Sequence, residues 1–268
     1  MLKDITLGQY FPGNSVAHKL DPRTKILLVT LYIIALFSAK GLVGYAVMIA
    51  TLAACVKVSH VGLKSLVRGL KPLVVIIVFT GVLNVFFTPD THYLWEWGIL
   101  RISVKGVENA LFMVVRIMLL VMGTFLMTYT TSPIRLTDGL ESLLNPLKKI
   151  HVPVHELAMM MAIALRFIPT LIEETDKIMS AQKARGADFE SGSLFQKAKA
   201  LVPILVPLFI SAFRRADELA TAMECRCYHG GEGRTKLHVL KYQRRDYVAL
   251  TGGAVILVLV VLLRKLGA

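Results

Sequence analysis

The strongest constraint on the fold is a series of long apolar segments that carry almost no charge. The clearest of these segments cover residues 72–88, 106–130 and 247–263. An apolar helix of about 20 residues matches the hydrocarbon thickness of a membrane. Two shorter segments, 26–38 and 41–58, have the same character, and flanking residues or local thinning of the bilayer can accommodate them. We therefore predict an all-α, polytopic membrane protein with about five transmembrane helices.

Composition supports a lipid environment and argues against a soluble nucleic-acid-binding protein. The chain is 55% hydrophobic and has a mean hydropathy of +0.61. Its net charge of +13 is spread over segments that border the apolar runs, whereas a nucleic-acid-binding domain gathers its basic residues on one face. The three cysteines form no C-x-x-C pair, so no disulfide framework is predicted.

The basic residues also predict the orientation, because cytoplasmic loops of membrane proteins are enriched in Lys and Arg. Seven basic residues flank the predicted spans on the side of the N-terminus, against three in the alternate loops. They are Lys3, Lys19, Arg23, Lys25, Lys64, Arg68 and Lys71, against Lys40, Arg101 and Lys105. We therefore predict a multi-pass protein of the cell membrane with a cytoplasmic N-terminus. The outer loop near 89–105 contains Trp95 and Trp97, which suit an interfacial anchor.

A long charged region interrupts the membrane pattern. Residues 131–247 carry seventeen Lys and Arg and thirteen Asp and Glu, a density too high for a path through lipid. The predicted organisation is an N-terminal cytoplasmic segment, a four-helix membrane region, a cytoplasmic coupling-helix region and a last transmembrane helix with its tail, at 1–25, 26–130, 131–246 and 247–268.

The charged region is nevertheless predicted to be helical. Prolines 133, 146, 153 and 203 stand where helices could begin or end, which gives helices near 134–149, 154–186 and 194–227. Pro169 and Pro207 fall inside the two long helices and are expected to kink or interrupt them.

The two long helices share one pattern, apolar in the first half and charged in the second. When the first helix is shifted by 41 residues along the sequence, four of its residues align with similar residues of the second. Chance similarity between two amphipathic helices is the alternative explanation. The aligned pairs are Asp176 with Asp217, Ser180 with Thr221, Ala181 with Ala222, and Arg185 with Arg226. We interpret the two helices as two copies of one functional element.

Motifs for catalysis and nucleotide binding are absent from the sequence. No G-x-x-x-x-G-K-[ST] loop and no H-E-x-x-H pair occurs, so we predict no enzyme activity and no cofactor or metal in this chain. Cys225, Cys227 and His229 lack a fourth ligand and are interpreted as a chance cluster.

Arg116 lies within a span and could belong to an ion path, but a packing contact between helices explains it more simply. A self-sufficient secondary transporter or channel is the alternative to the subunit function described below.

The N-terminal sequence Gly8-Gln9-Tyr10-Phe11-Pro12-Gly13-Asn14-Ser15, followed by His18, Leu20, Asp21-Pro22-Arg23 and Lys25, resembles the start of a known family. The family is that of the energy-coupling factor (ECF) transmembrane T components, EcfT, which is close to the CbiQ-like permeases of cobalt and biotin importers. Ala184-Arg185-Gly186 matches the family's Ala-Arg-Gly motif, and Cys225-Arg226-Cys227 stands at the second such position in a looser form.

The resemblance implies a transmembrane scaffold subunit of an ECF-type ABC importer for a vitamin or metal ion. In that family two ABC-type ATPases, EcfA and EcfA′, dock on the arginine motifs, here Ala184, Arg185, Gly186, Cys225, Arg226 and Cys227. A separate S component captures the substrate, and nucleic acid is not a partner. The apolar halves of the long helices would face the S component. The residues expected on this surface are Leu157, Met160, Met161, Leu165 and Ile168, then Leu201, Leu205 and Phe209, with Met159, Ile204 and Leu208 in the same stretches.

Overall fold

The computed structural model describes residues 10–88, 93–97, 100–189, 193–230 and 239–266. The chain forms two compact units, which are described separately. The membrane unit comprises residues 8–139 and 240–268, and the long-helix unit comprises residues 140–239 with the N-terminal residues 1–7. Gly8 and Gln9 of the N-terminal motif lie outside the described residues.

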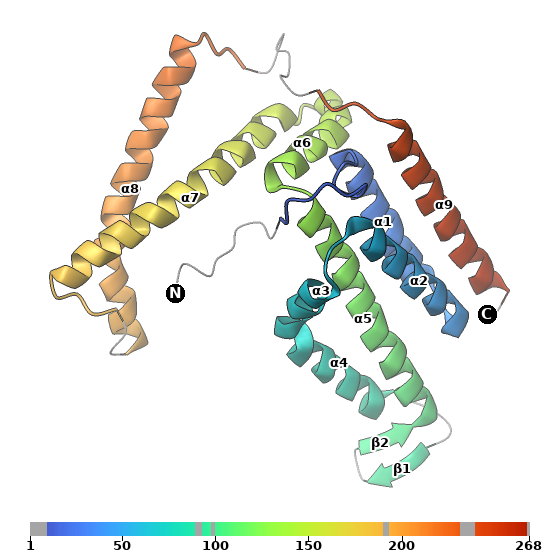
Figure 1. The fold of residues 1–268 in the computed structure, drawn as a ribbon. Helices are drawn as coiled ribbons and strands as arrows, with labels where there is room; N and C mark the ends of the chain where they lie inside the picture. Colours follow the sequence, from blue (N-terminus) through green and yellow to red (C-terminus); the bar gives the residue numbers. More distant parts are fainter. Residues whose placement is uncertain (1–9, 89–92, 98–99, 190–192, 231–238, 267–268) are drawn as a thin grey trace. The chain divides into compact units, whose positions relative to one another are not determined.

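The membrane unit is built from long helices joined by short connections (Figure 1). In chain order they are α1 (Pro22–Ser38), α2 (Gly41–Ser59), α3 (Leu63–Leu70), η2 (Lys71–Leu73), α4 (Val74–Phe87), α5 (Val104–Thr130) and α9 (Arg244–Lys265). Each of the five predicted spans therefore coincides with a helix, and the predicted all-α membrane fold is confirmed.

A short antiparallel hairpin, which the sequence analysis did not predict, precedes α5. It pairs β1 (Tyr93–Trp97) with β2 (Leu100–Ser103). The predicted outer loop therefore contains regular structure, because backbone groups there pair with each other. The interfacial role of Trp95 and Trp97 stays a prediction, since the structure describes only their backbone.

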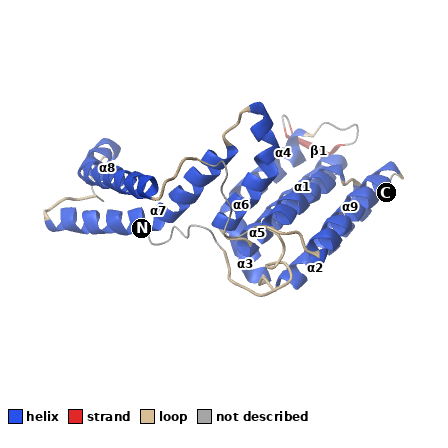
Figure 2. Cartoon of the chain, turned by 90° about the horizontal axis from the view of Figure 1, so that it is seen from above, coloured by secondary structure: helices blue, strands red, loops and turns tan. Residues whose placement is uncertain are grey.

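Close approach of α1 to α5 and α9 fixes the centre of the membrane unit. Figure 2 shows α1 beside both helices, in agreement with their contacts. Tyr32 of α1 donates a hydrogen bond to the carbonyl oxygen of Leu119 on α5 at 3.0 Å. Its ring lies over Gly123, where an added Cβ would come within 2.5 Å of the ring. Only glycine at this position leaves room for the tyrosine.

Five helical stretches are long and apolar enough to cross a membrane among the described residues, but they are not quite the five predicted. They are Gly41–Ser59, Leu63–Phe87, Val104–Thr130, Val154–Ala184 and Arg244–Lys265. The helix α1 has 17 residues and falls just short. The long helix from Val154 qualifies because its first half is apolar, although its second half carries the charges that place it in the predicted cytoplasmic region.

The long-helix unit contains α7 (Val154–Ala184) and α8 (Leu194–Cys225), preceded by η3 (Asn145–Ile150). The helix α6 (Pro133–Leu144) spans the boundary between the two units. The bounds agree closely with prediction, but the role of Pro203 was wrong. Pro203 and Pro207 both lie inside α8, and Pro169 lies inside α7 without ending it. Each proline removes one backbone donor, and the adjoining turns keep the helix continuous.

Candidate functional site: the ends of two crossing helices

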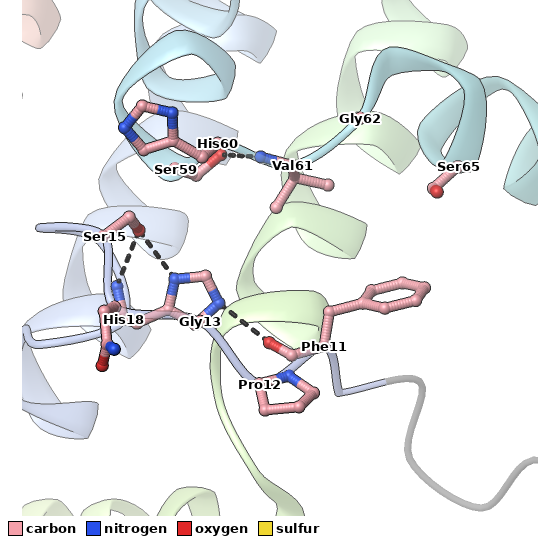
Figure 3. A pocket seen from close by; sticks show the side chains of 11 residues that line it. Phe11, Pro12, Gly13, Ser15, His18, Ser59, His60, Val61, Gly62 and Ser65 are labelled. Atoms are coloured by element: carbon pink, nitrogen blue, oxygen red, sulfur yellow. Dashed lines mark hydrogen bonds between the residues drawn. The ribbon is translucent and has the colours of Figure 1, made fainter.

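The first part of the N-terminal motif, residues 11–18, folds against the membrane unit and is called the clip below. His18 lies within hydrogen-bond distance of the Ser15 hydroxyl (2.7 Å) and the Phe11 carbonyl oxygen (2.9 Å), as Figure 3 shows. Because a carbonyl oxygen only accepts, Nε2 of His18 donates to it. The backbone N–H of Phe11 donates to the carbonyl oxygen of Tyr129 at 3.0 Å. A Cβ at Gly13 would meet the His18 ring at 2.8 Å, so glycine is needed there.

A pocket of about 570 Å³ lies beside this clip. Its lining residues come from residues 11–18 and from the segment that joins α2 to α3, with Ser59 at the end of α2, His60 in the turn and Ser65 on α3 (Figure 3). Both ring nitrogens of His18 already have partners, so the motif histidine serves the clip and does not offer a free ligand.

The second part of the motif joins the starts of α1 and α9. The Asp246 carboxylate accepts from the backbone N–H groups of Asp21 and Gln243, each at 2.8 Å. Asp21 caps α1 and forms an ion pair with Arg23 at 3.0 Å. The hydrogen bond to Asp21 raises the pKa of the Arg23 guanidinium, although its partial burial opposes the shift. Lys25 donates to the Thr130 carbonyl oxygen at 2.8 Å and so completes the end of α5.

The long-helix unit presents a different arrangement, in which α7 and α8 cross (Figure 1). Arg215 of α8 forms an ion pair with Glu174 of α7 at 2.8 Å, and the Ser211 hydroxyl donates to the same carboxylate. A further bond runs from the Gln182 amide to the Pro203 carbonyl oxygen at 3.4 Å. These polar contacts hold the crossing in one register.

The end of α7 is a Schellman motif built on the Ala-Arg-Gly sequence. Arg185 is the C-cap, and Gly186 follows with a left-handed φ of 88°. The N–H of Gly186 donates to the carbonyl oxygen of Lys183, and the N–H of Ala187 donates to that of Gln182, both at 3.0 Å. These bonds satisfy carbonyl groups that a helix end otherwise leaves unpaired.

The end of α8 repeats this geometry with different residues. Arg226 is the C-cap, and the next residue, Cys227, has a left-handed φ of 54°. The N–H of Cys227 donates to Glu224 at 2.8 Å, and the N–H of Tyr228 donates to Met223 at 3.0 Å. A left-handed cysteine costs about 1 kcal/mol relative to glycine. The two motifs, which match loosely in sequence, therefore share one backbone conformation.

The 41-residue alignment of the two helices also has structural counterparts. Ser180 donates to the Asp176 carbonyl oxygen at 2.7 Å, and the aligned Thr221 donates to that of Asp217 at 2.9 Å. The members of the crossing ion pair, Glu174 and Arg215, are aligned with each other by the same shift.

Both cap arginines are exposed, and neither side chain forms an ion pair or hydrogen bond with any residue that the structure describes. Each lies eleven residues beyond its own member of the Glu174–Arg215 pair, a distance of about 16 Å along a helix. A Cβ at Gly186 would meet no atom within 4 Å. The arrangement can therefore present two guanidinium groups, at equal distances from the crossing, to a separate molecule.

The predicted apolar faces are largely open. Leu157, Met160 and Met161 of α7 are exposed, while Leu165 and Ile168 are half-buried. Leu201, Leu205 and Phe209 of α8 are also exposed.

The exposed apolar surface of α8 differs in part from the predicted residues. Ile204 is only 5% exposed, because it packs inside the fold. Exposed apolar side chains also occur at Val202, Val206, Ile210 and Phe213. Their spacing of three or four residues marks a second helical stripe that the sequence shows on inspection.

Two further polar groups have contacts that decide their interpretation. Nε of Arg116 donates to the Tyr45 hydroxyl at 2.8 Å, and its guanidinium lies 5.8 Å from the ring centre of Phe37. These contacts support the predicted role in packing between helices. Around Cys225 and Cys227, as elsewhere in the described ranges, no group of three or more potential ligands lies close enough to hold a metal ion.

Comparison with known proteins places the whole chain in one family. The CbiQ family, described as Cobalt transport protein, matches residues 13–237. The energy-coupling factor transporter transmembrane protein EcfT of Ruminiclostridium cellulolyticum is 52% identical over 265 residues, which cover 99% of this chain and 98% of the relative. EcfT of Clostridium kluyveri is 56% identical over 250 residues, 93% of each chain, and EcfT of Bacillus subtilis is 46% identical over 264 residues, 98% of this chain and 100% of the relative. The chain, with its two exposed cap arginines, therefore belongs to the EcfT family of energy-coupling factor transporter transmembrane proteins.

Proposed function

We propose that this chain is the transmembrane coupling subunit of an ECF importer and that Arg185 and Arg226 each dock into one of two ABC-type ATPases, EcfA and EcfA′. The observation that carries the proposal is the pair of like helix ends, each with an exposed arginine that pairs with no described residue and lies at the same distance from the crossing. A guanidinium offers five donors in a planar fork, which suits carboxylates and carbonyl groups in a groove.

The crossing explains how two docking points could act together. Because Glu174 and Arg215 tie the helices at their aligned positions, a displacement of one end is transmitted through the crossing to the other helix. Two docking points on one scaffold also form a bivalent grip, in which the second contact is made at a high effective concentration. The chain itself then needs no nucleotide site and hydrolyses no ATP.

The open apolar faces supply the site for the S component, the separate small protein that captures the vitamin or metal ion. Met160 and Met161 are flexible and polarisable, which suits contact with more than one partner. Burial of this surface against another membrane protein would remove exposed apolar area from the long-helix unit.

The orientation that fits this assembly puts the N-terminus and the ends of α7 and α8 in the cytoplasm. Cys225 and Cys227 are exposed and provide native labels for its test. In inside-out vesicles that hold the chain without its ATPases, a membrane-impermeant maleimide should modify them, and in intact cells it should leave them unmodified. Modification from outside would contradict the orientation.

The test of the whole proposal is purification of the chain from its native host with identification of the proteins that accompany it. We expect two ATPases and one or more small membrane proteins. The reconstituted chain alone should show neither ATP hydrolysis nor uptake. Uptake by the isolated chain would instead support the self-sufficient transporter or channel.

A further inference from the structure

A groove of about 520 Å³ in the membrane unit lies between α3, the start of α4 and α5. Its residues are Val67, Arg68 and Leu70 of α3, Lys71 of η2, Val74 and Ile77 of α4, and Met118 of α5. The accessible lining is almost wholly apolar, because even Arg68 and Lys71 border the groove with the carbon atoms of their side chains. The groove is therefore apolar, with two basic residues along its edge.

The two cations have no acidic partner in the surrounding chain. Between Asp21 and Asp90 the sequence contains no Asp or Glu at all. Arg68 and Lys71 are exposed, and within the described ranges neither side chain forms an ion pair or hydrogen bond. An anion is the ligand that this charge distribution favours.

The two cations lie where α3 leads into α4, because Arg68 is on α3 and Lys71 is in the short η2 that follows it. The helix α3 is amphipathic, with Leu66 and Leu70 buried and Lys64 and Arg68 exposed, as expected for a helix lying in the membrane interface. Lys71 and Pro72 form a short turn, after which α4 continues as an apolar, membrane-spanning stretch. The groove runs from this turn toward Met118, seven residues before Phe125, the α5 ring that contacts α3 at Gly69.

We propose that the groove binds one anionic phospholipid, whose phosphate lies between Arg68 and Lys71 and whose acyl chain lies against Val74, Ile77 and Met118. Basic pockets between membrane helices bind anionic headgroups in this way. A free inorganic phosphate would satisfy the two cations but would leave the apolar floor uncovered. The inference depends on insertion in a membrane and does not depend on ATPase docking.

The test uses the full-length chain, purified alone, in nanodiscs of phosphatidylcholine with a minor fraction of phosphatidylglycerol. Native mass spectrometry after release into detergent counts the phosphatidylglycerol molecules retained per protein. The double variant R68Q/K71Q should weaken lipid retention about thirtyfold. Each basic residue near an anionic surface contributes about fivefold in affinity, and the two contributions multiply. The matched control K57Q/K64Q removes the same charge from residues that do not line the groove, and it should retain the lipid.

A second variant tests the apolar floor without changing charge. Met118→Trp fills the groove and should also weaken lipid retention, with circular dichroism and gel filtration used to verify the fold. Retention by R68Q/K71Q, or an equal loss in K57Q/K64Q, would overturn the proposal. Displacement of the lipid by inorganic phosphate would identify a simple anion site instead. Cross-linking of Val67→Cys to a protein in the native complex, with no lipid retained, would assign the groove to a partner helix.

Discussion

The charged groups of the membrane unit and those at the ends of α7 and α8 have opposite surroundings. Asp246 is 1% exposed and accepts two backbone hydrogen bonds, and Lys25 is buried against the end of α5. Arg185 and Arg226 are exposed and bind no described residue with their side chains.

The difference separates two kinds of motif that look equally distinctive in sequence. The Asp-Pro-Arg-x-Lys stretch forms internal bonds that join α1 to α9 and α5, so it specifies the fold. The arginine motifs end helices with the same hydrogen-bond pattern, and their side chains bind no described residue, so they are available for recognition. Substitutions in the first class should unfold the protein, and substitutions in the second should release partners from a folded protein.

The largest effect on stability is expected for Asp246→Ala. The change leaves the buried N–H of Asp21 without its acceptor, at about 1–3 kcal/mol. The N–H of the exposed Gln243 loses its acceptor too, at a smaller cost because water can replace it. Thermal unfolding in detergent should show a clear fall in Tm. Asp217→Ala, which removes an exposed carboxylate from α8, is the control and should leave Tm nearly unchanged. Equal shifts for the two variants would remove the distinction between the units.

A charge on the apolar faces should release the S component from a folded chain. Met160→Glu or Leu205→Glu would bury a carboxylate at an apolar contact, which is strongly unfavourable, so binding of the S component should fall at least a hundredfold. Co-purification is the measurement, and Met160→Leu is the control that keeps volume and polarity. Simultaneous loss of the ATPases would point to misfolding and contradict a separate interface.

The crossing should matter more for transport than for assembly. Glu174→Gln removes the charge of the ion pair with Arg215 but keeps an oxygen that can accept from Ser211. A partly exposed ion pair contributes only about 0.5–1 kcal/mol, so both partners should still bind while ATP-dependent uptake slows. Its neighbour Glu173 is exposed and has no contact described above, so Glu173→Gln is the matched control. Unchanged uptake in Glu174→Gln would show that the crossing transmits nothing.

The smallest expected effect is on the local stability of the two helix caps, which should change in opposite directions. Cys227→Gly should stabilise the α8 cap by about 1 kcal/mol, and Gly186→Ala should destabilise the α7 cap by a similar amount, because only glycine adopts a left-handed φ without strain. Hydrogen exchange of the amides at 186, 187, 227 and 228 should change about fivefold in opposite directions. Changes in the same direction would mean that the two caps do not share one geometry.

Much of the fold could be predicted because long apolar and amphipathic runs dominate this sequence. The ends of α7 and α8 fell within two residues of prediction, since glycine and charge mark them. The hairpin at Tyr93–Ser103 was missed because its backbone pairing gives little signal in a short aromatic segment. Pro203 was misplaced because a local breaking tendency was overridden by the surrounding helix.

The sequence identifies residues for the candidate site, but their geometry comes only from the structure. Sequence comparison aligned Arg226 with Arg185, but the cysteine after Arg226 concealed the shared left-handed cap. Periodicity could not show that Ile204 is buried while Val206 is exposed, because this depends on which turn of α8 packs inside the unit.

The most direct test of the account measures partner affinity and stability together for Arg185→Ala, Arg226→Ala and the double variant. Each truncation should cost about 2–5 kcal/mol at its own ATPase, since groups in the groove lose their partner, or at least about thirtyfold in affinity. A single variant should keep its complex through the surviving site and transport poorly, and the double variant should lose both ATPases. Thermal unfolding of all three chains should match that of the unmodified protein. A double variant that binds both ATPases with unchanged affinity, or one that unfolds as readily as Asp246→Ala, would contradict the assignment of these arginines to recognition.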